Sequence, residues 1–596
     1  MTSINSVSKP TVNSGKPVPS YDSLVNAESS AMQFLNVEEN ETVFQRLLIV
    51  HGQVPGIQGA RDKVIVSNPR LPTLEFPAAD GYFKASVRLE EGENTLSFEY
   101  TQASKCVSQG TLRIQMTAHH NKSPLQLAIM VAKDSAESFD TLFGPGNNNL
   151  DMAVRKLRCT AYMWQAFFAE HMYRHGFGRR TFALEEAMMK DTLSKDEAER
   201  MIAKVHIIRS RFTVAELRNK EIAQQWKFIA GEEEIKERHR PLDLLEMIKT
   251  EVRECEDIGD NPVACMMMDA HWDAELQIVV GQGAYGSSDP QPKVATLGSH
   301  RAYSWPATFD EIPSAFMDIT PTDPQKVANN SKVCAETWQV AAVSIGTFVN
   351  MVMGALSVRR SPTGITQWYR HLNRAFMACE PNRPGPIKQH DEDTAHFHRT
   401  DAVRLRHHPC LRLPSDLPLA EKQAQRSAGT ITKVDGGFLL RNESGITLVQ
   451  VWLKGECKAF IEYTVENFER RKNGEVSANE DEKAAEFPLQ VMISNERLLE
   501  MAGERAGSAM TSKLPLELLR LFTPRPALKH VNPTDCPPDK RPAPKVTGIG
   551  SYITELTSAP LVEPVETPQQ RKARLKTERA LQARDNIIRG MSTWDP

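Results

Sequence analysis

The stretch GTFVNMVMGALSVRR, residues 346–360, decides how the middle of this chain is interpreted. With the residues before it, it belongs to a run without a charged side chain that extends from 337 to 358. Such a run is long enough to cross a bilayer, but polar residues within it, such as Gln339 and Asn350, favour a helix buried in a protein core. We therefore expect a core helix here that ends in a basic turn.

The totals of the sequence limit the possible classes of protein. At roughly 150 residues per domain, 596 residues predict about three or four domains. The formal net charge of −3 argues against a general nucleic-acid binder. The nine cysteines are odd in number and form no CxxC pair, which indicates free thiols in a reducing compartment. The N-terminus lacks the apolar segment of a secretory signal, so we expect a cytoplasmic protein.

Composition and periodicity divide the chain into five parts and predict an α+β multidomain fold. Strand-like alternation, then strands alternating with helices, then strand-like alternation again distinguish the three folded parts. The expected parts are a disordered N-terminus (1–38), a β-sandwich (40–120), an α/β core (124–415), a second β-rich domain (425–523), and a proline-rich linker with a basic helical tail (524–596).

Three local patterns predict specific elements. In FKASVRLEEGENTLSFEY (83–100), two alternating runs flank EEGEN, which predicts a β-hairpin. LQLAIMVAKDS (125–135) begins as a continuous apolar run, typical of a strand buried on both faces. The run 149–178 carries His and Arg near its end and Gly176 after them, which predicts a long helix that stops at the glycine.

Several long segments of the centre resemble a fungal family of zinc metallopeptidases with a zincin-like core, and the likeness covers about residues 40–420. In that family an N-terminal β-domain often precedes the protease core, as the expected boundaries here do. The segments that carry the likeness are LAIMVAKDS (127–135), KLRCTAYMWQAFFAEHMYRHGFGRRTFALEE (156–186), AKVHIIRSRFTVAELR (203–218), LGSHRAYSWP (297–306), LNRAFMACEP (372–381) and HRTDAVRLRHHPCLRLPSD (398–416).

The resemblance implies a zinc-binding helix immediately before the LNRAF segment. Members of the family carry HExxHxxGxxH there. Two histidines four residues apart lie on one helical face and bind Zn²⁺, the Glu between them is the general base, and a third His follows the Gly turn.

In this chain the residues at the motif positions differ. The pattern places the two helical histidines at Asn350 and Gly354, the general base at Met351, the turn glycine at Ser357 and the third histidine at Arg360. The register is supported by the absence of any histidine between positions 301 and 370.

None of these residues can perform the family's chemistry. Asn350 is a weak ligand, Met351 cannot accept a proton, Gly354 has no side chain and Arg360 places a cation where a cation should bind. Thr366 stands where the family tends to have a Met. We therefore expect no zinc, no other cofactor and no catalytic residues. Because the flanking segments still match, we also expect the helix backbone to accept a histidine at Gly354. The alternative is that the space around Met351 and Gly354 has been filled, so that a larger side chain no longer fits.

Other groups of polar residues leave alternatives open. His390, His396 and His398 suggest a replacement metal site, since His396 and His398 would face one side of a strand. The competing interpretation is that this segment is structural.

Near the middle of the chain, His271 lies close in sequence to Asp269 and Asp273, which suggests a functional group at a strand end. The adjacent Ser299 and His300 could be nucleophile and base, but adjacency in sequence is not triad geometry. Met266 and its two neighbours are expected in the core rather than in a metal site. The basic tail is expected to be a solvated helix, with weak contact to RNA or to an anionic surface as the minority interpretation.

These observations favour a non-catalytic pseudoprotease that acts as a binding or scaffold protein. One alternative is a repurposed enzyme of another class, for example in fungal secondary metabolism. Another is a zinc peptidase with a rebuilt site. We expect an unknown protein or peptide partner, no nucleic acid and no membrane.

Overall fold

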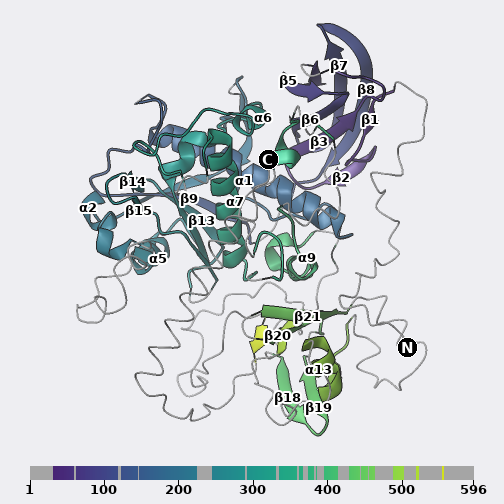
Figure 1. Ribbon diagram of the computed structural model, residues 1–596, viewed down its shortest axis with the longest axis vertical. Helices are drawn as coiled ribbons and strands as arrows, with labels where there is room; N and C mark the ends of the chain where they lie inside the picture. The colour runs from purple at the N-terminus through teal and green to yellow at the C-terminus, as the bar shows by residue number, and fades with distance from the viewer. Residues whose placement is uncertain are drawn as a thin grey trace.

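The computed structural model describes residues 31–502 with gaps, together with two short strands beyond them (Figure 1). The expected disordered N-terminus falls mostly outside the described residues, and so does the expected basic tail. The residues not described are 1–30, 60–61, 119–122, 145, 197, 224–243, 289–290, 330–333, 359–360, 367–373, 381–383, 386–394, 414–415, 417–428, 443–444, 454–455, 464–486, 503–518, 523–552 and 556–596.

The N-terminal part is an eight-stranded sheet that curls around its own apolar core (Figure 1). Its strands are β1 (Gln33–Phe34), β2 (Glu41–Val43), β3 (Leu47–Gln53), β4 (Asp62–Asn68), β5 (Leu71–Ala79), β6 (Tyr82–Arg88), β7 (Gly92–Gln102) and β8 (Lys105–Met116). They are hydrogen-bonded in the order β1-β3-β6-β5-β4-β7-β8-β2. The sequence predicts a sandwich of two sheets, whereas the pairing joins all eight strands in one sheet.

The predicted hairpin between β6 and β7 is wrong. β6 pairs with β3 and β5, while β7 pairs with β4 and β8. The residues between β6 and β7 therefore cross from one part of the curled sheet to another. In this connection, buried Leu89 donates its backbone N–H to the Arg46 carbonyl oxygen at 2.8 Å. Asn94 accepts from the Glu90 N–H at 3.0 Å and shapes the turn. The alternation correctly predicts two strands, β6 and β7, but it does not reveal which strands pair.

The central part contains a five-stranded mixed sheet in the order β12-β9-β13-β17-β16. The first four strands in this order run parallel, and β16 pairs antiparallel with β17 at the edge. β9 and β13 are buried at every position, which confirms the prediction of a strand covered on both faces. The strands are β9 (Gln126–Val131), β12 (Val205–Arg209), β13 (Val263–Met267), β16 (Tyr285–Ser287) and β17 (Val294–Gly298).

Helices cover both faces of this sheet. One core cluster joins the sheet to α1, α7 and α9, and a second joins its other face to α2 and α5. In Figure 1, α1 lies between the sheet and the N-terminal part. The helices are α1 (Leu150–Arg174), α2 (Val214–Leu217), α5 (Leu244–Glu254), α6 (Ile312–Ala315), α7 (Thr337–Ala355), α8 (Arg374–Met377) and α9 (Arg399–Arg406), with 3-10 turns η2 (Lys220–Ile222), η3 (Ser299–Ser304) and η4 (Pro409–Leu411).

The long helix α1 forms as the sequence predicts. Asn149 caps it by accepting from the Met152 backbone N–H at 2.9 Å. His171 and Arg174 occupy the last turn, where the Arg174 cation complements the helix dipole. Gly176, with φ of 80°, ends it in the left-handed region.

Two hairpins extend from the central part, and a small β-rich part follows it. The hairpins are β10 (Glu186–Lys190) with β11 (Glu199–Ala203), and β14 (His271–Asp273) with β15 (Ile278–Val280). The β-rich part forms two sheets, β18-β19-β22 and β21-β20-β23-β24, and its described residues include helix α13. Its elements are β18 (Thr430–Val434), β19 (Gly437–Arg441), β20 (Leu448–Leu453), β21 (Glu456–Glu462), β22 (Gln490–Ser494), α13 (Asn495–Ala502), β23 (Leu519–Phe522) and β24 (Ile553–Glu555).

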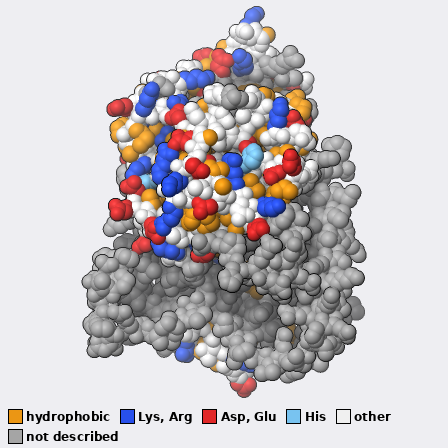
Figure 2. Space-filling view, turned by 90° about the vertical axis from the view of Figure 1, so that its left-hand side faces the viewer, with side chains coloured by type: hydrophobic (Ala, Val, Ile, Leu, Met, Phe, Trp, Pro, Cys, Tyr) orange, Lys and Arg blue, Asp and Glu red, His pale blue; other side chains and the backbone are white. Residues whose placement is uncertain are grey.

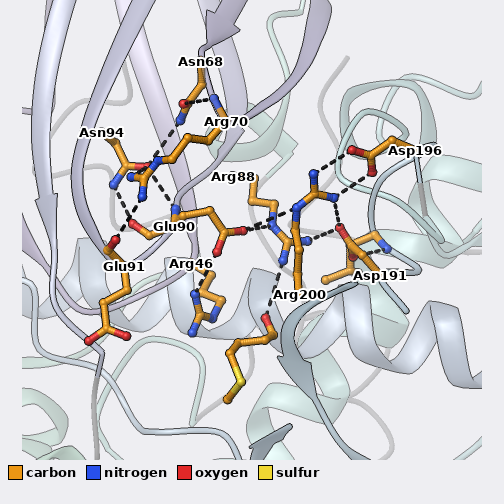
Figure 3. Close-up of polar contacts among 12 residues, drawn as sticks. Arg46, Asn68, Arg70, Arg88, Glu90, Glu91, Asn94, Asp191, Asp196 and Arg200 are labelled. Atoms are coloured by element: carbon orange, nitrogen blue, oxygen red, sulfur yellow. Dashed lines mark hydrogen bonds and ion pairs between the residues drawn. The ribbon is translucent and has the colours of Figure 1, made fainter. Parts of the chain in front are cut away.

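Buried ion pairs join the N-terminal sheet to the central part (Figure 3). Arg88 of β6 donates to the Asp191 carboxylate at 2.6 Å, and Asp191 is fully buried. Arg200 of β11 contacts the same carboxylate at 3.1 Å. Arg46 pairs with Glu186 at 2.8 Å, and burial of this pair fixes the two parts against each other.

The uncharged helix α7 is long and apolar enough to cross a membrane by length and composition alone. In the structure, however, 72% of its apolar window is buried inside the protein. It contacts β16, β17 and η3, and Ser344 on it accepts from the Trp305 indole N–H at 2.7 Å. The prediction of a core helix is confirmed.

Candidate functional site

Helix α7 carries the first positions of the motif and begins with a reciprocal cap. The Glu336 backbone N–H donates to the Gln339 side chain at 3.0 Å, and the Glu336 side chain accepts from the third helical N–H. Burial of the helix on nearly all sides then fixes its rotation against the sheet. The motif positions near its C-terminal end therefore have defined neighbours.

Asn350 faces the segment that follows the helix. Its Nδ2 donates to the Ile365 carbonyl oxygen at 2.6 Å. The amide keeps its second N–H and its Oδ1 for other partners, but a neutral amide oxygen is a poor zinc ligand. The side chain at the first motif position thus ties α7 to the segment 361–366.

Gly354 faces β16 at very short range. A β-carbon built on Gly354 would lie 2.5 Å from the Gly286 carbonyl oxygen, and one built on Gly286 would lie 2.1 Å from the Met351 carbonyl oxygen. Both distances are far below van der Waals contact with backbone atoms that cannot swing away. The expectation that Gly354 would accept a histidine is therefore wrong, because the helix and the strand pack backbone to backbone.

Ser357 occupies the position of the turn glycine and keeps the glycine-like backbone. Its φ is 61°, a conformation that costs an ordinary L-residue about 1–2 kcal/mol. Ser357 donates from Oγ to Ser288 Oγ at 2.8 Å, and Arg404 of α9 donates to its carbonyl oxygen. These contacts hold the turn closed. Arg360, the position of the third histidine, lies outside the described residues.

A buried carboxylic acid stands next to the turn. Asp401 of α9 is fully buried and accepts from Ser361 Oγ and, at 3.2 Å, from Thr366 Oγ1. Thr366 Oγ1 also accepts from the Ser361 backbone N–H at 3.1 Å. Burial raises the pKa of Asp401 to about 6, against smaller effects of these hydrogen bonds and of Arg404. Thr366, at the family's Met position, thus belongs to a hydrogen-bonded network.

The described residues at the motif positions do not fit a zinc ion. Zinc in proteins prefers thiolate, imidazole and carboxylate ligands. Here the positions supply an engaged amide (Asn350), a thioether (Met351) and a bare backbone (Gly354). Within the ranges that the structure describes, no three His, Cys, Asp or Glu side chains are grouped to hold a metal ion elsewhere.

The histidines near position 396 make separate structural contacts. His396 precedes α9 in a loop, and its Nε2 lies 3.1 Å from Thr363 Oγ1. His398 caps α9, with its Nδ1 accepting from the Thr400 backbone N–H at 3.2 Å. The expectation that both face one side of a strand is therefore wrong, and His390 lies outside the described residues.

His271 has a carboxylate partner that the sequence did not indicate. Its Nδ1 lies 2.7 Å from Asp140 Oδ1, and the Trp272 N–H donates to Asp140 Oδ2 at 2.8 Å. The predicted neighbour Asp269 instead accepts from the Ala132 N–H at 2.8 Å and the Ser135 hydroxyl at 2.5 Å. Asp140 lies far away in the sequence in an irregular loop, so no periodicity could have linked it to His271.

The group around His271 is not assembled as the sequence suggested. Asp273 accepts from the backbone N–H groups of Glu275 and Leu276 at 3.0 and 2.9 Å and shapes the β14–β15 turn.

Figure 2 looks onto the side of the molecule that carries α2, β14 and β15, and shows acidic, basic and apolar side chains interspersed there. This face therefore lacks a field of one sign.

Ser299 and His300 are both buried and do not form a nucleophile and base. The Ser299 hydroxyl donates to the Met268 carbonyl oxygen at 2.6 Å. Both ring nitrogens of His300 are buried and have no hydrogen-bond partner among the residues that the structure describes, and burial holds the His300 pKa well below its ordinary value. Met266 and Met268 are fully buried in the core, as predicted.

Comparison with known proteins agrees with the resemblance in the sequence. Residues 31–447 match a family described as "Putative peptidase family". The chain is 31% identical over 458 residues to "Putative zinc metalloproteinase YIL108W" of Saccharomyces cerevisiae, covering 73% of this chain and 64% of that relative. It is 30% identical over 472 residues to "Putative zinc metalloproteinase C607.06c" of Schizosaccharomyces pombe, covering 75% of this chain and 71% of that relative. The chain thus spans about two thirds of the length of these relatives.

A second, separate match covers the C-terminal segment. Residues 512–596 match a family described as the N-terminal part of the 70 kDa U1 small nuclear ribonucleoprotein. Over 88 residues this chain is 39% identical to the "U1 small nuclear ribonucleoprotein 70 kDa homolog" of Schizosaccharomyces pombe, covering 15% of this chain and 34% of that relative. Composition did not reveal this similarity, because it indicates only a proline-rich linker and a basic tail in this segment. Over residues 31–447, and so over most of its length, the chain belongs to the peptidase family that includes the two fungal relatives.

Proposed function

We propose that this chain is a non-catalytic member of its peptidase family that acts by binding a protein or peptide partner. The observation that carries the proposal is the contact between α7 and β16. Gly354 stands where the family has a zinc-binding histidine, and its backbone lies against Gly286 with no room for a side chain. The ligand chemistry at Asn350 and Met351 supports the same conclusion.

The arrangement of the central sheet supports a zincin-like core. The helix expected to carry the motif, α7, packs against this sheet at its antiparallel edge strand β16. In this chain the hydrogen bond from Asn350 to Ile365, the Ser357–Ser288 contact and the Asp401 network draw together the segments around the motif. We attribute a structural role to this region. We also propose that the protein is located in the cytoplasm.

Peptidase activity is the direct test of this proposal. The full chain should leave an unstructured protein substrate intact, with added zinc or with a strong chelator. The melting temperature should be the same in both conditions, since no metal binding is coupled to folding. Cleavage that the chelator abolishes and zinc restores would refute the proposal and favour a rebuilt site.

A second candidate function concerns residues 512–596. Their similarity to the N-terminal part of a U1 ribonucleoprotein component favours association with a ribonucleoprotein particle of that kind. This candidate function differs from the prediction that the protein has no nucleic-acid partner. The test is co-migration of the full chain with purified U1-type particles on native gels, with a chain ending at residue 511 as control. Equal behaviour of the two proteins would refute it.

A further inference from the structure

Strands β5 and β6 are neighbours in the N-terminal sheet for only a short distance. Their pairing consists of Ala78 with Phe83 and Ala79 with Tyr82. From Leu71 to Pro77, β5 pairs with β4 alone among the strands that the structure describes. The two strands therefore diverge, and this stretch of β5 has an open edge.

A cleft of about 350 Å³ lies where the strands diverge. Its walls come from β4, β5 and β6 on one side and from two loops of the central part on the other, at positions 193–195 and 309–310. Ligand sites prefer such junctions, and their volumes start at roughly 300 Å³. None of the residues that line the cleft belongs to α7, so binding of a ligand in the cleft does not require an intact zinc motif.

The interior of the cleft is apolar. Val66, Leu74, Val87, Leu193 and Phe309 line it, and the side chains along the inner face of β5 become less buried toward the opening. Phe76 is buried at 1% exposure, whereas Leu74 is only half-buried. The other four side chains are only 2–4% exposed, so the half-buried Leu74 at the mouth is the one that offers contact area to an apolar group from solvent.

The charged groups around the cleft are already paired. Arg88 lines it, but its guanidinium is held by Asp191 at 2.6 Å and by Glu90 at 2.9 Å (Figure 3). At the rim, Lys195 pairs with Asp310 at 2.5 Å. A charged ligand would have to break one of these pairs, so the cleft favours an uncharged apolar group.

The open edge of β5 supplies the polar part of a binding site. Backbone groups of β5 that point away from β4 can pair with an additional strand, as exposed sheet edges do in peptide recognition. Pro72 and Pro77 cannot donate an N–H and confine this pairing to the residues between them. Thr73 and Glu75 are exposed and leave the edge accessible.

We propose that the cleft between β5 and β6 binds an extended peptide segment of a partner protein. The segment adds to the edge of β5 between Pro72 and Pro77 and inserts a large apolar side chain between Leu74 and Phe309. Main-chain hydrogen bonds supply affinity, and the cleft supplies selectivity for the inserted residue. The site deepens the proposed binding function by naming its surface and the kind of partner it takes.

The test uses the full chain and a library of random peptides displayed on phage. Enriched peptides should carry a bulky apolar residue flanked by strand-forming residues. A synthetic peptide of the enriched sequence should lose at least tenfold in affinity to Leu74→Glu or Leu71→Glu in a fluorescence anisotropy titration. Hydrogen exchange should show new protection at the amides between Pro72 and Pro77.

The control is Val107→Glu on β8, an apolar residue of the same sheet that is 43% exposed and outside the cleft. It should leave peptide affinity unchanged. If Leu74→Glu does not fold, Leu71→Glu, at the far end of the strand from the buried Phe76, still tests the site. Enriched peptides that bind both cleft variants as well as the parent would overturn the proposal, and so would a library without enriched peptides. Binding of small apolar molecules without protection of β5 would also overturn it. A chain that proves to be an active peptidase but binds these peptides at β5 would refute only the proposed lack of catalysis.

Discussion

Gly354 of α7 and Gly286 of β16 lie backbone against backbone. A β-carbon on the first would be 2.5 Å from the carbonyl oxygen of the second. In the register that the resemblance implies, the helix of the zinc motif thus packs against the edge strand at the position expected for the second histidine.

The first prediction is that Gly354→Ala destabilises the protein although alanine is the better helix former. The propensity gain is about 1 kcal/mol. The contact with the Gly286 carbonyl forces a backbone shift, and overpacking of this kind costs about 1–3 kcal/mol. Urea unfolding should show a lower midpoint for Gly354→Ala and for Gly286→Ala. Gly259→Ala, where a β-carbon meets nothing within 4 Å, is the control and should keep the parent midpoint.

The second prediction concerns acid. Burial lowers the pKa of five histidines from 6.5 in the unfolded chain to between about 3 and about 4, so the unfolded state binds more protons below pH 6.5. Stability should therefore be level above about pH 6.5 and fall as the pH drops toward 3, by up to about 1.4 kcal/mol per pH unit for each histidine. The histidines are His51, His175, His398, His407 and His408.

Thermal unfolding across this pH range measures the effect. His51→Gln should flatten the acid branch of the curve, because it removes one group that must charge on unfolding. An acid branch as steep as that of the parent would contradict the assignment of His51 to a dry core.

The third prediction concerns Asp401, whose contribution to stability falls, rather than rises, with increasing pH. The pKa of Asp401 is raised from 3.8 to about 6, so its contribution to stability is full below pH 3.8 and is lost as the pH rises through 6. Asp401→Asn cannot ionise and should remove this loss. The stability of the variant relative to the parent should rise between about pH 4 and pH 6 and stay level above pH 6, as measured by urea midpoints at several pH values. A difference that does not change with pH would show that Asp401 is not buried as an acid.

The fourth prediction concerns the junction between the N-terminal sheet and the central part. Arg88→Met leaves the fully buried Asp191 with fewer partners, and breaking one side of a buried pair costs about 3–5 kcal/mol. The control is Arg113→Met, whose partner Glu39 is 44% exposed, and surface pairs contribute about 1 kcal/mol at most. Calorimetry should show a large loss of melting temperature for Arg88→Met and little change for Arg113→Met.

How far the sequence predicts the fold depends on whether a contact is local. The buried strand β9, the cap and stop of α1 and the core position of α7 follow from periodicity and from single residues such as Gly176. The pairing of β6 with β5 rather than β7 does not, because strand alternation contains no information about neighbours.

The same limit applies to the candidate site. The alignment with the family placed Asn350 and Gly354 on the motif helix from sequence alone. That Gly354 has no room for a side chain depends on Gly286, 68 positions earlier in the sequence, and only the folded backbone reveals it. Likewise, the sequence predicts a group of His271 with Asp269 and Asp273, whereas the carboxylate that pairs with His271 is Asp140, in a loop without a recognisable pattern.

The central claim is that the zinc site of this family is absent here, and the zinc content of the purified full chain tests it most directly. Protein purified without added metal and dialysed against a mild chelator should contain far less than one zinc per chain by elemental analysis, because the motif positions supply no histidine or carboxylate. A zinc content near one per chain after that dialysis would contradict the account.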